Sequence, residues 1–247
     1  MGTPRTSWAR HAIVLAAGNG DRFERGERSK LLTPVVGTPL LIRTLESACT
    51  AGITDAHVVL GYDASSVRAV AESSAPAGLH LHFHLNRVWH QENGLSVLAA
   101  RPCFWDRPFA LLMGDHIFEP QVLRRLLAAP RESGEMVLGV DRQAHAPEFV
   151  AEATKVRMDG SRVAAIGKEI DDFDGLDTGL FVGDRSLFDG LEASCADGDS
   201  TLSGGVRRMA AQGLVRGVDI GDAAWCDIDT VDDLAAAEEL LAPVPGV

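Results

Sequence analysis

A glycine-rich turn follows the first apolar segment of the chain. The segment Ala16–Arg22 holds two glycines around an asparagine, and Lys30 follows eight positions after Arg22. Backbone N–H groups in such a turn can hold phosphate oxygens, to which Arg offers a rigid fork and Lys a mobile point charge. Phe23 replaces the third glycine of the dinucleotide-binding fingerprint, and the chain has no Walker A pattern. The turn is therefore a candidate phosphate loop, with an ordinary strand-to-helix turn as the alternative.

Carboxylates occur at two distant points where divalent-metal chemistry could take place. Asp115 ends the apolar run Phe109–Met113, and Asp227 and Asp229 are two positions apart near the other end of the chain. One carboxylate from each segment would suit Mg²⁺, which prefers oxygen ligands, keeps several waters and is shared with substrate phosphates. The alternatives are a turn-capping role for Asp115 and a helix-start role for Asp229.

Several histidines are further candidates. His80, His82 and His84 alternate along one predicted strand and so share a face. Successive positions on one face are roughly 6.7 Å apart, so the three cannot bind one metal ion without help. A half-exposed strand face is the favoured interpretation. His116 is a candidate contact to phosphate or to Mg²⁺-bound water, or a hydrogen-bonded residue at a strand end.

Strands and helices alternate in the first half of the chain and place these residues. We expect strands at 12–16, 57–60, 79–85 and 109–113, and helices at 40–51, 63–74, 93–100 and 120–129. This alternation is typical of α/β proteins with a doubly wound, mostly parallel, Rossmann-like sheet. Asp63 is the expected cap of the second helix.

The second half of the chain has shorter predicted strands. They lie at 136–140, 154–158, 163–167, 178–182, 215–220 and 225–228, with helices at 186–192 and 201–212. Thr230 and Asp233 resemble a capping box at the start of a last helix. We therefore expect one domain over residues 1–247, with a nucleotide-binding half at about 10–130 and a smaller mixed-sheet acceptor lobe at about 131–230.

Composition excludes several classes of protein. The chain has 247 residues, 46% of them hydrophobic, and a formal net charge of −12. This charge opposes nucleic-acid and anionic membrane partners. The four cysteines show no CxxC spacing, and no apolar run approaches the roughly 20 residues of a membrane span. We expect a cytoplasmic protein without a signal peptide.

The motifs together resemble a known superfamily. They are, in chain order, Leu15–Arg22 with Lys30, Met113–His116, Glu152–Val156, Gly167–Lys168, Asp177–Gly179 and Trp225–Thr230. This set resembles nucleotidyltransferases with the GT-A-like fold, and within them CTP:inositol-1-phosphate cytidylyltransferases and the related phosphonate cytidylyltransferases. Two departures are a longer segment from Gly20 to Lys30 and Ser29 in place of the usual proline, which leave a lid role for residues 21–30 open.

The resemblance implies a role for each matching residue. Nucleotide-binding residues would be Leu15, Ala16, Ala17, Gly18, Asn19 and Gly20 around the triphosphate, with Asn93, Gly94 and Ser96 near the base and ribose. The reaction would be carried by Arg22, Lys30, Lys155 and Lys168, the last two at the acceptor's phosphoryl group. Asp115 and Asp227 would hold Mg²⁺, and His116, Asp177, Thr178 and Asp229 are acceptor-binding candidates. Turn capping is the alternative for Asp177.

The implied reaction is Mg²⁺-dependent transfer of CMP from CTP to a small acceptor that carries a phosphate or phosphonate. Inositol 1-phosphate and a small phosphonate both remain open as acceptors, and the sequence allows a homodimer. The alternatives are another sugar-phosphate nucleotidyltransferase, a GT-A glycosyltransferase, or a nucleotide-sensing module without catalysis. The segment Gly114–Asp115–His116 lacks the second carboxylate of a DxD motif, which argues against a glycosyltransferase.

Overall fold

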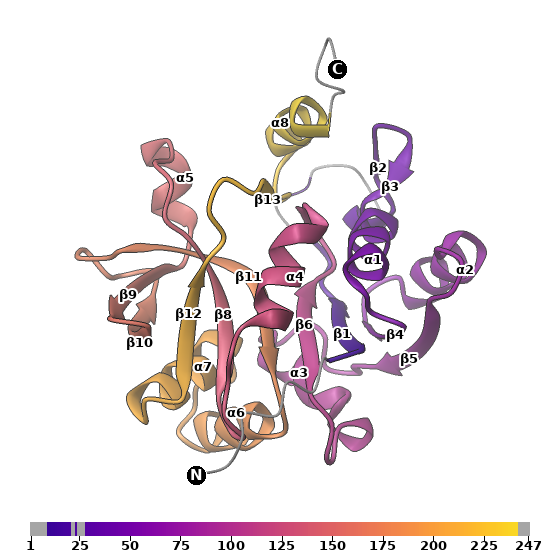
Figure 1. The fold of residues 1–247 in the computed structure, drawn as a ribbon. Coiled ribbons are helices and arrows are strands. Elements are labelled where there is room, and N and C mark those ends of the chain that lie inside the picture. Colours follow the sequence, from indigo (N-terminus) through magenta and orange to yellow (C-terminus); the bar gives the residue numbers. More distant parts are fainter. Residues whose placement is uncertain (1–8, 21–22, 24–27, 242–247) are drawn as a thin grey trace.

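The computed structural model describes residues 9–20, 23 and 28–241 (Figure 1). Arg22, one of the expected catalytic residues, lies outside these residues. The strands are β1 (His11–Ala16), β2 (Pro34–Val35), β3 (Thr38–Pro39), β4 (Asp55–Leu60), β5 (His80–Leu85), β6 (Phe109–Met113), β7 (His116–Phe118), β8 (Met136–Asp141), β9 (Lys155–Asp159), β10 (Arg162–Gly167), β11 (Gly175–Gly183), β12 (Val215–Asp219) and β13 (Trp225–Asp227). The helices are α1 (Leu40–Ala51), α2 (Ala64–Ser74), α3 (Gly94–Ala99), α4 (Pro120–Ala128), α5 (Pro147–Glu152), α6 (Ser186–Ala196), α7 (Leu202–Ala211) and α8 (Val231–Leu241), with short 3₁₀ turns η1 (Lys30–Leu32) and η2 (Arg101–Cys103).

One nine-stranded sheet organises both halves of the chain. Its strand order is β5-β4-β1-β6-β11-β8-β12-β10-β9. The first four strands are parallel, as the alternation of strands and helices predicts. β11 is antiparallel to both of its neighbours, β6 and β8. The strands of the second half, expected as a smaller mixed-sheet lobe, pair onto the edge of β6 and extend the same sheet.

Helices cover both faces of this sheet. Alternate residues of β1 point to opposite faces, and both sets are buried: Val14 packs in the core under α1, α2 and α4, while Ile13 packs in the core under α3, α6 and α7. Burial on both faces explains why β1 is a continuous apolar run. A third, smaller core joins α8 to the rest of the protein through Leu234, Ala237 and Ile228. In Figure 1, β13, α5 and α8 lie at one end of the sheet and α6 at the other.

The ends of two helices test the capping expectations. At α8 the capping box is confirmed: Thr230 N–H donates to Asp233 Oδ2 (2.6 Å), and Asp233 N–H donates to Thr230 Oγ1 (3.3 Å). At α2 the expectation is wrong in its mechanism. Asp63 holds the N-cap position in a left-handed conformation, but its side chain caps no helical N–H. Its Oδ2 instead accepts a hydrogen bond from Ser29 N–H (3.4 Å), just before Lys30.

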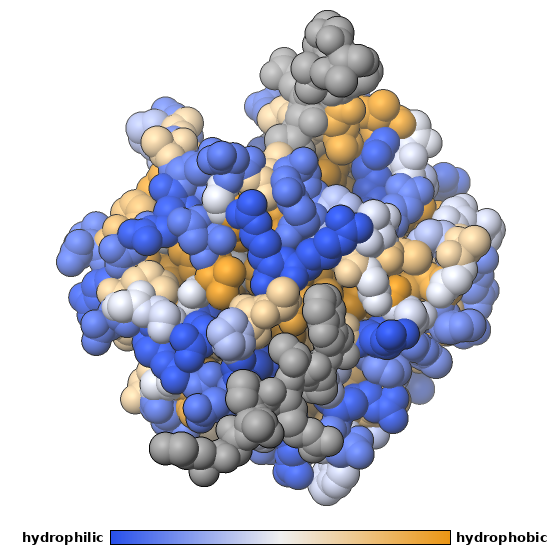
Figure 2. All heavy atoms as spheres, in the orientation of Figure 1, coloured by the Kyte–Doolittle hydropathy of each residue, from blue (hydrophilic) through white to orange (hydrophobic). Residues whose placement is uncertain are grey.

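The surface in the orientation of Figure 1 is largely hydrophilic (Figure 2). Hydrophobic residues gather near α8 and the β2–β3 hairpin, where Val36 and Val231 are exposed. Among the described residues, no helix combines the length and the apolar character that crossing a bilayer requires.

Candidate active site

The turn between β6 and β7 presents Asp115 at the carboxyl end of the parallel strands. This end of the sheet is where α/β proteins bind ligands. Gly114 N–H donates to Leu15 O on the neighbouring strand (2.9 Å). On the other side, the buried Thr44 hydroxyl of α1 lies 3.1 Å from Gly114 O and 2.9 Å from His116 O. Thr44, which the sequence did not single out, therefore helps to fix the position of Asp115.

Antiparallel pairing of β7 with β13 brings the second carboxylate to the same place. Asp227 lies opposite His116 in the register. One oxygen each of Asp115 and Asp227 and one nitrogen of His116 lie within 4.8 Å of one another. The two aspartates that were expected to share a metal ion are thus neighbours in the structure.

Lys30 joins the aspartates from the other side. Its Nζ lies 2.8 Å from Asp115 Oδ2 and 2.9 Å from Asp229 Oδ1, and it donates to Ile228 O (2.8 Å). Burial by itself would lower the pKa of Lys30, but the Asp115 and Asp229 carboxylates outweigh it and raise this pKa above its usual value. Lys30 is therefore a buried, permanent cation. Asp229, expected to bind the acceptor, contacts this lysine and also lines the neighbouring cavity.

Gly20 explains why the turn before Lys30 needs glycine. Its φ of +68° is in the left-handed region, and a Cβ atom at this position would lie 2.8 Å from Lys30 Cδ. The glycine turn is thus in direct contact with the stem of the lysine. Along this turn, Ala16 and Ala17 are buried and Leu15, Asn19 and Gly20 are half-buried, while Gly18 is exposed at the sheet edge.

The donors at Asp115 and Asp227 fit a divalent cation. Lys30 Nζ contacts Asp115 Oδ2, while Asp115 Oδ1 lies 3.9 Å from His116 Nε2. Asp227 Oδ1 is buried, and its contact with His116 Nε2 (3.3 Å) is an ion pair without good hydrogen-bond geometry. A divalent cation such as Mg²⁺ prefers oxygen ligands, so it would give this buried oxygen a well-oriented partner.

The surroundings of His116 favour its protonated form. Its Nε2 lies 3.3 Å from Asp227 Oδ1, and its Nδ1 contacts Thr178 O (2.9 Å). Burial opposes protonation, but the Asp227 and Asp115 carboxylates outweigh it and raise the pKa of His116 to about 9. The imidazolium therefore lies against the two carboxylates at neutral pH.

A cavity of about 590 Å³ opens beside these residues. Trp225 forms part of its wall. The side chain of Trp225 is held by Asp141, the last residue of β8, whose Oδ2 accepts hydrogen bonds from Trp225 Nε1 (2.6 Å) and His145 Nε2 (2.8 Å). Phe149 packs against both rings. Sequence reasoning did not identify Asp141 or Phe149. A strand-end carboxylate was the available signal for Asp141, of the same kind as the one used for Asp115.

The expected acceptor residues on β11 have different positions. Asp177 lines the cavity and accepts a hydrogen bond from Gly179 N–H on Oδ1 (2.8 Å). Burial raises the pKa of Asp177 to about 6. Thr178 does not face the cavity, because its side chain is fully buried and donates to Gly139 O (2.9 Å).

The two expected phosphoryl-binding lysines also separate. Lys168 lines the cavity with an exposed side chain, and its Nζ lies 4.0 Å from Glu152 Oε2. Lys155 is buried, and its Nζ donates to the carbonyl oxygens of Lys168 (2.8 Å) and Ala151 (3.3 Å). Lys155 therefore holds the main chain of Lys168, and it is not among the residues that line the cavity.

The expected base-binding segment joins α3 to α7. Asn93 lines the cavity, and its Oδ1 accepts a hydrogen bond from Leu202 N–H (2.8 Å). Gly94 is buried in close contact with Ser200 and Leu191. Ser96 is buried, and its hydroxyl accepts a hydrogen bond from Asn86 Nδ2 (3.0 Å). Of the three, Asn93 alone lines the cavity.

Comparison with protein families identifies the chain. Residues 12–212 match the model of the MobA-like NTP transferase domain. The chain belongs to the MobA-like NTP transferase family. It therefore carries a nucleotidyltransferase domain with the GT-A-like α/β fold, as the motifs predict.

Two curated relatives show which NTP transferases are similar. The chain is 37% identical over 233 residues to a bifunctional IPC transferase and DIPP synthase of Rubrobacter xylanophilus, covering 93% of this chain and 51% of the relative. It is 42% identical over 125 residues to a CMP-5'-(3-aminopropyl)phosphonate synthase of Streptomyces rubellomurinus, covering 49% of this chain and 20% of the relative. The chain thus spans about half the length of the first relative.

Solved NTP transferases share the fold. The inositol-1-phosphate CTP transferase from T. maritima superimposes with a TM-score of 0.81 at 24% identity, covering 96% of this chain and 99% of that chain. A UDP-glucose pyrophosphorylase complexed with UDP-glucose gives a TM-score of 0.79 at 16% identity, covering 94% and 98%. Because identities are this low, these likenesses support the architecture rather than a substrate.

Proposed function

We propose that this chain transfers CMP from CTP to the phosphoryl or phosphonyl group of a small acceptor and releases pyrophosphate. The observation that carries the proposal is the meeting of Asp115, Asp227 and Lys30 beside the glycine turn, with a cavity next to them. The relatives' names support CTP as donor and a phosphate or phosphonate as acceptor.

Asp115 and Asp227 would hold Mg²⁺, which supplies positive charge to the triphosphate when it is bound. The ammonium group of Lys30 is a fixed cation beside the Asp115 carboxylate. Gly20 allows the backbone of the glycine turn to lie against the aliphatic part of the Lys30 side chain. Arg22 and the N–H groups of the turn would bind the phosphates. The chain's net negative charge makes these local cations necessary, because the overall field repels an anionic substrate.

The chemistry needs no general base. A phosphate or phosphonate oxygen is anionic at neutral pH, so it can attack the α-phosphorus directly. The new bond joins this oxygen to the α-phosphorus, and the bond from the α-phosphorus to the β-phosphate oxygen breaks with its electrons leaving on pyrophosphate. The protein's task is to hold two anions in line and to neutralise the leaving charge.

The cavity would hold the acceptor. Lys168 places an ammonium group on its wall for the phosphate or phosphonate, and Lys155 holds the main chain behind it. Glu148 and Asp177 line the same cavity and offer carboxylates to amino or hydroxyl groups at the acceptor's other end. Both acceptor types suggested by the relatives, an inositol phosphate and an aminoalkylphosphonate, carry such groups.

The test is pyrophosphate release from CTP and Mg²⁺ with a panel of acceptors. The panel contains inositol 1-phosphate, 3-aminopropylphosphonate, 2-hydroxyethylphosphonate and glucose 1-phosphate. We expect turnover with CTP and with the first acceptor or with a phosphonate. Turnover restricted to glucose 1-phosphate, or supported by UTP in place of CTP, would favour a sugar-phosphate nucleotidyltransferase instead.

A matched pair of variants controls this experiment. Asp227→Asn removes a negative charge from the candidate metal site, and we expect kcat to fall by about two decades or more, the size of losing one preorganised stabilising group. Asp222→Asn makes the same change at an exposed position nearby in the chain and should leave kcat unchanged. Equal activity of both variants would contradict a metal role for Asp227.

A further inference from the structure

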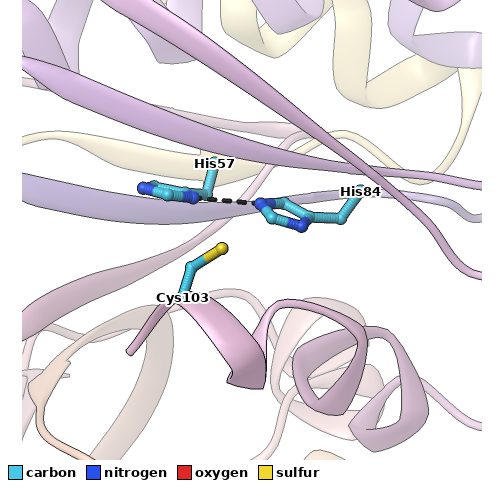
Figure 3. A group of neighbouring side chains, drawn as sticks. All are labelled: His57, His84 and Cys103. Carbon is cyan, nitrogen blue, oxygen red and sulfur yellow. Dashed lines mark hydrogen bonds between the residues drawn. The ribbon is translucent and has the colours of Figure 1, made fainter. Parts of the chain in front are cut away.

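A second group of metal-binding side chains lies on the outer strands of the sheet. His57 of β4, His84 of β5 and Cys103 of η2 each offer one ligand atom, and these atoms lie within 4.8 Å of one another (Figure 3). None of these residues belongs to the candidate active site, which is built on β6, β7 and β13. The imidazoles belong to adjacent parallel strands, so the backbone of the sheet fixes their spacing.

The two imidazoles face each other through their nitrogens. His57 Nδ1 and His84 Nε2 share a hydrogen bond of 3.0 Å (Figure 3), and the ring planes are nearly parallel, at 17°. Two nitrogens bound to one tetrahedral Zn²⁺ lie about 3.3 Å apart, because each Zn–N bond is about 2.0–2.1 Å long. The hydrogen bond already holds the pair near the spacing that one ion requires, and a bound ion would take the place of its proton. In Figure 3 the sulfur of Cys103 points toward the space between the two rings.

Cys103 is held in this position by its neighbour. Phe104 is fully buried, and its ring packs edge-on against His57 at a centroid distance of 4.6 Å. The cysteine side chain is exposed, so an ion from solvent can reach it. A buried anchor next to an exposed ligand is an arrangement that keeps the thiol beside the imidazoles.

His57 has its polar contact on the side of the ring that faces His84. His57 is buried, and its second nitrogen, Nε2, has no hydrogen-bond partner in the described part of the chain. The neighbouring His82 differs, because its Nε2 already contacts Asp55 Oδ1 (3.1 Å).

We propose that His57, His84 and Cys103 form a Zn²⁺ site separate from the candidate active site. Two imidazoles and one thiolate are the ligands that Zn²⁺ takes in proteins, whereas Mg²⁺ requires oxygen. Binding displaces the thiol proton of Cys103 to solvent. Three protein ligands leave the fourth position of a tetrahedral ion open to water. The ion would tie η2 to the sheet, since Cys103 is its last residue.

The site can be tested with Co²⁺ as a spectroscopic probe for Zn²⁺. The full chain, freed of metal with a chelator, is titrated with Co²⁺ and then with Zn²⁺. We expect one equivalent of Co²⁺ to produce a thiolate-to-cobalt charge-transfer absorption, which Zn²⁺ removes by displacement. Cys103→Ser should lose this absorption, and His84→Ala should weaken Co²⁺ binding by more than about tenfold, since even residues behind metal ligands commonly have effects of this size.

Two controls separate this site from the others. Asp227→Asn alters the candidate active site, and Cys195→Ser changes a cysteine outside the group. Both variants should leave the charge-transfer absorption intact. Zn²⁺ should also raise the melting temperature of the unmodified chain more than that of Cys103→Ser, because it binds the folded state. The proposal fails if the unmodified chain shows no thiolate absorption, or if the absorption persists in Cys103→Ser.

Discussion

The two oxygens of Asp115 face different partners. Oδ2 lies against the buried Lys30 ammonium, and Oδ1 faces His116 and the side where Asp227 lies. Burial alone would raise the pKa of Asp115, but Lys30 and His116 hold it below its usual value. The carboxylate is thus kept ionised before any substrate or ion arrives. Such preorganisation avoids rearranging the site during the reaction.

Asp177 illustrates a cost that accompanies a binding site. Burial raises its pKa to about 6 in the folded protein, whereas an unfolded Asp has a pKa of about 3.9. Between these values the folded state binds more protons than the unfolded state, so this residue makes stability fall as pH rises through the window. Above about pH 6 the free energy of unfolding stays lower by the full amount of this effect.

Asp177→Asn should therefore stabilise the protein at neutral pH. The amide keeps an oxygen for Gly179 N–H but carries no charge. We expect the variant to unfold like the unmodified chain near pH 4 and to be more stable by about 1–3 kcal/mol near pH 7, from the pKa shift. Urea unfolding at both pH values in a chelating buffer measures this difference. A difference that does not change with pH would rule out ionisation of Asp177 as its cause.

Lys168 supplies the exposed ammonium group of the cavity wall. Lys168→Met keeps much of the side chain's length but removes the charge. Because a hydrogen bond to a charged group contributes about 1.5–3 kcal/mol, we expect the acceptor KM to rise by at least about tenfold, with the KM for CTP little changed. Glu169→Gln alters the exposed neighbouring residue and serves as the control. A rise confined to the KM for CTP would indicate that Lys168 binds the nucleotide rather than the acceptor.

At the scale of elements, β7 and β13 are short strands with a large effect. Each has three residues, yet their pairing places Asp227 opposite His116. The capping box of α8 continues this arrangement, because Asp233 Oδ2 also accepts a hydrogen bond from Asp229 N–H (2.9 Å). Asp229 in turn contacts Lys30. The start of the last helix thus supports a lysine near the beginning of the chain.

β11 supports the same site through a glycine. Gly179 has a φ of +71°, and a Cβ atom there would collide with the His116 ring. Gly160 has a similar φ of +57°, but a Cβ atom there would meet open space. Comparing alanine substitutions at these two glycines therefore distinguishes the effect of backbone strain from the effect of a steric collision.

Gly179→Ala should reduce both turnover and stability, because the methyl group displaces His116 from Asp227. Gly160→Ala should cost only the strain of a left-handed alanine, about 1 kcal/mol, with kcat unchanged. Thermal unfolding and pyrophosphate release on both variants provide the measurement. Similar effects of the two substitutions on kcat would show that the contact with His116 is unimportant.

At the scale of the whole molecule, an acidic protein must bind an acidic nucleotide. The cavity itself is lined by several carboxylates, including Asp115, Asp227, Asp229 and Asp233. Without a cation these groups repel a triphosphate. Nucleotide binding is therefore expected to depend on a divalent ion.

CTP with Mg²⁺ should stabilise the chain far more than CTP with a chelator. A ligand at about 100 times its Kd adds about 2.7 kcal/mol. A domain of this size gains about 2–4 °C in melting temperature per kcal/mol. A thermal-shift series with CTP, UTP and a UDP-sugar, each with and without Mg²⁺, measures the effect. Equal shifts with and without the ion would contradict a metal-assisted triphosphate site.

The sequence by itself determined the local structure and the kinds of chemistry available. Apolar runs indicate the buried strands, and capping residues indicate the helix ends. The carboxylates of Asp115 and Asp227 are recognised by their places at strand ends. These signals were sufficient because each depends on residues close together in the chain. The parallel order of the first strands follows from the same alternation.

Only the tertiary structure decided which distant groups meet. Insertion of β11 between β6 and β8 made one sheet of two expected lobes, and it buried Thr178 while leaving Asp177 in the cavity. The partner of His84 came from a neighbouring strand rather than from its own alternating histidines. Strand order and register arise from packing over the whole chain, which no local window of sequence contains.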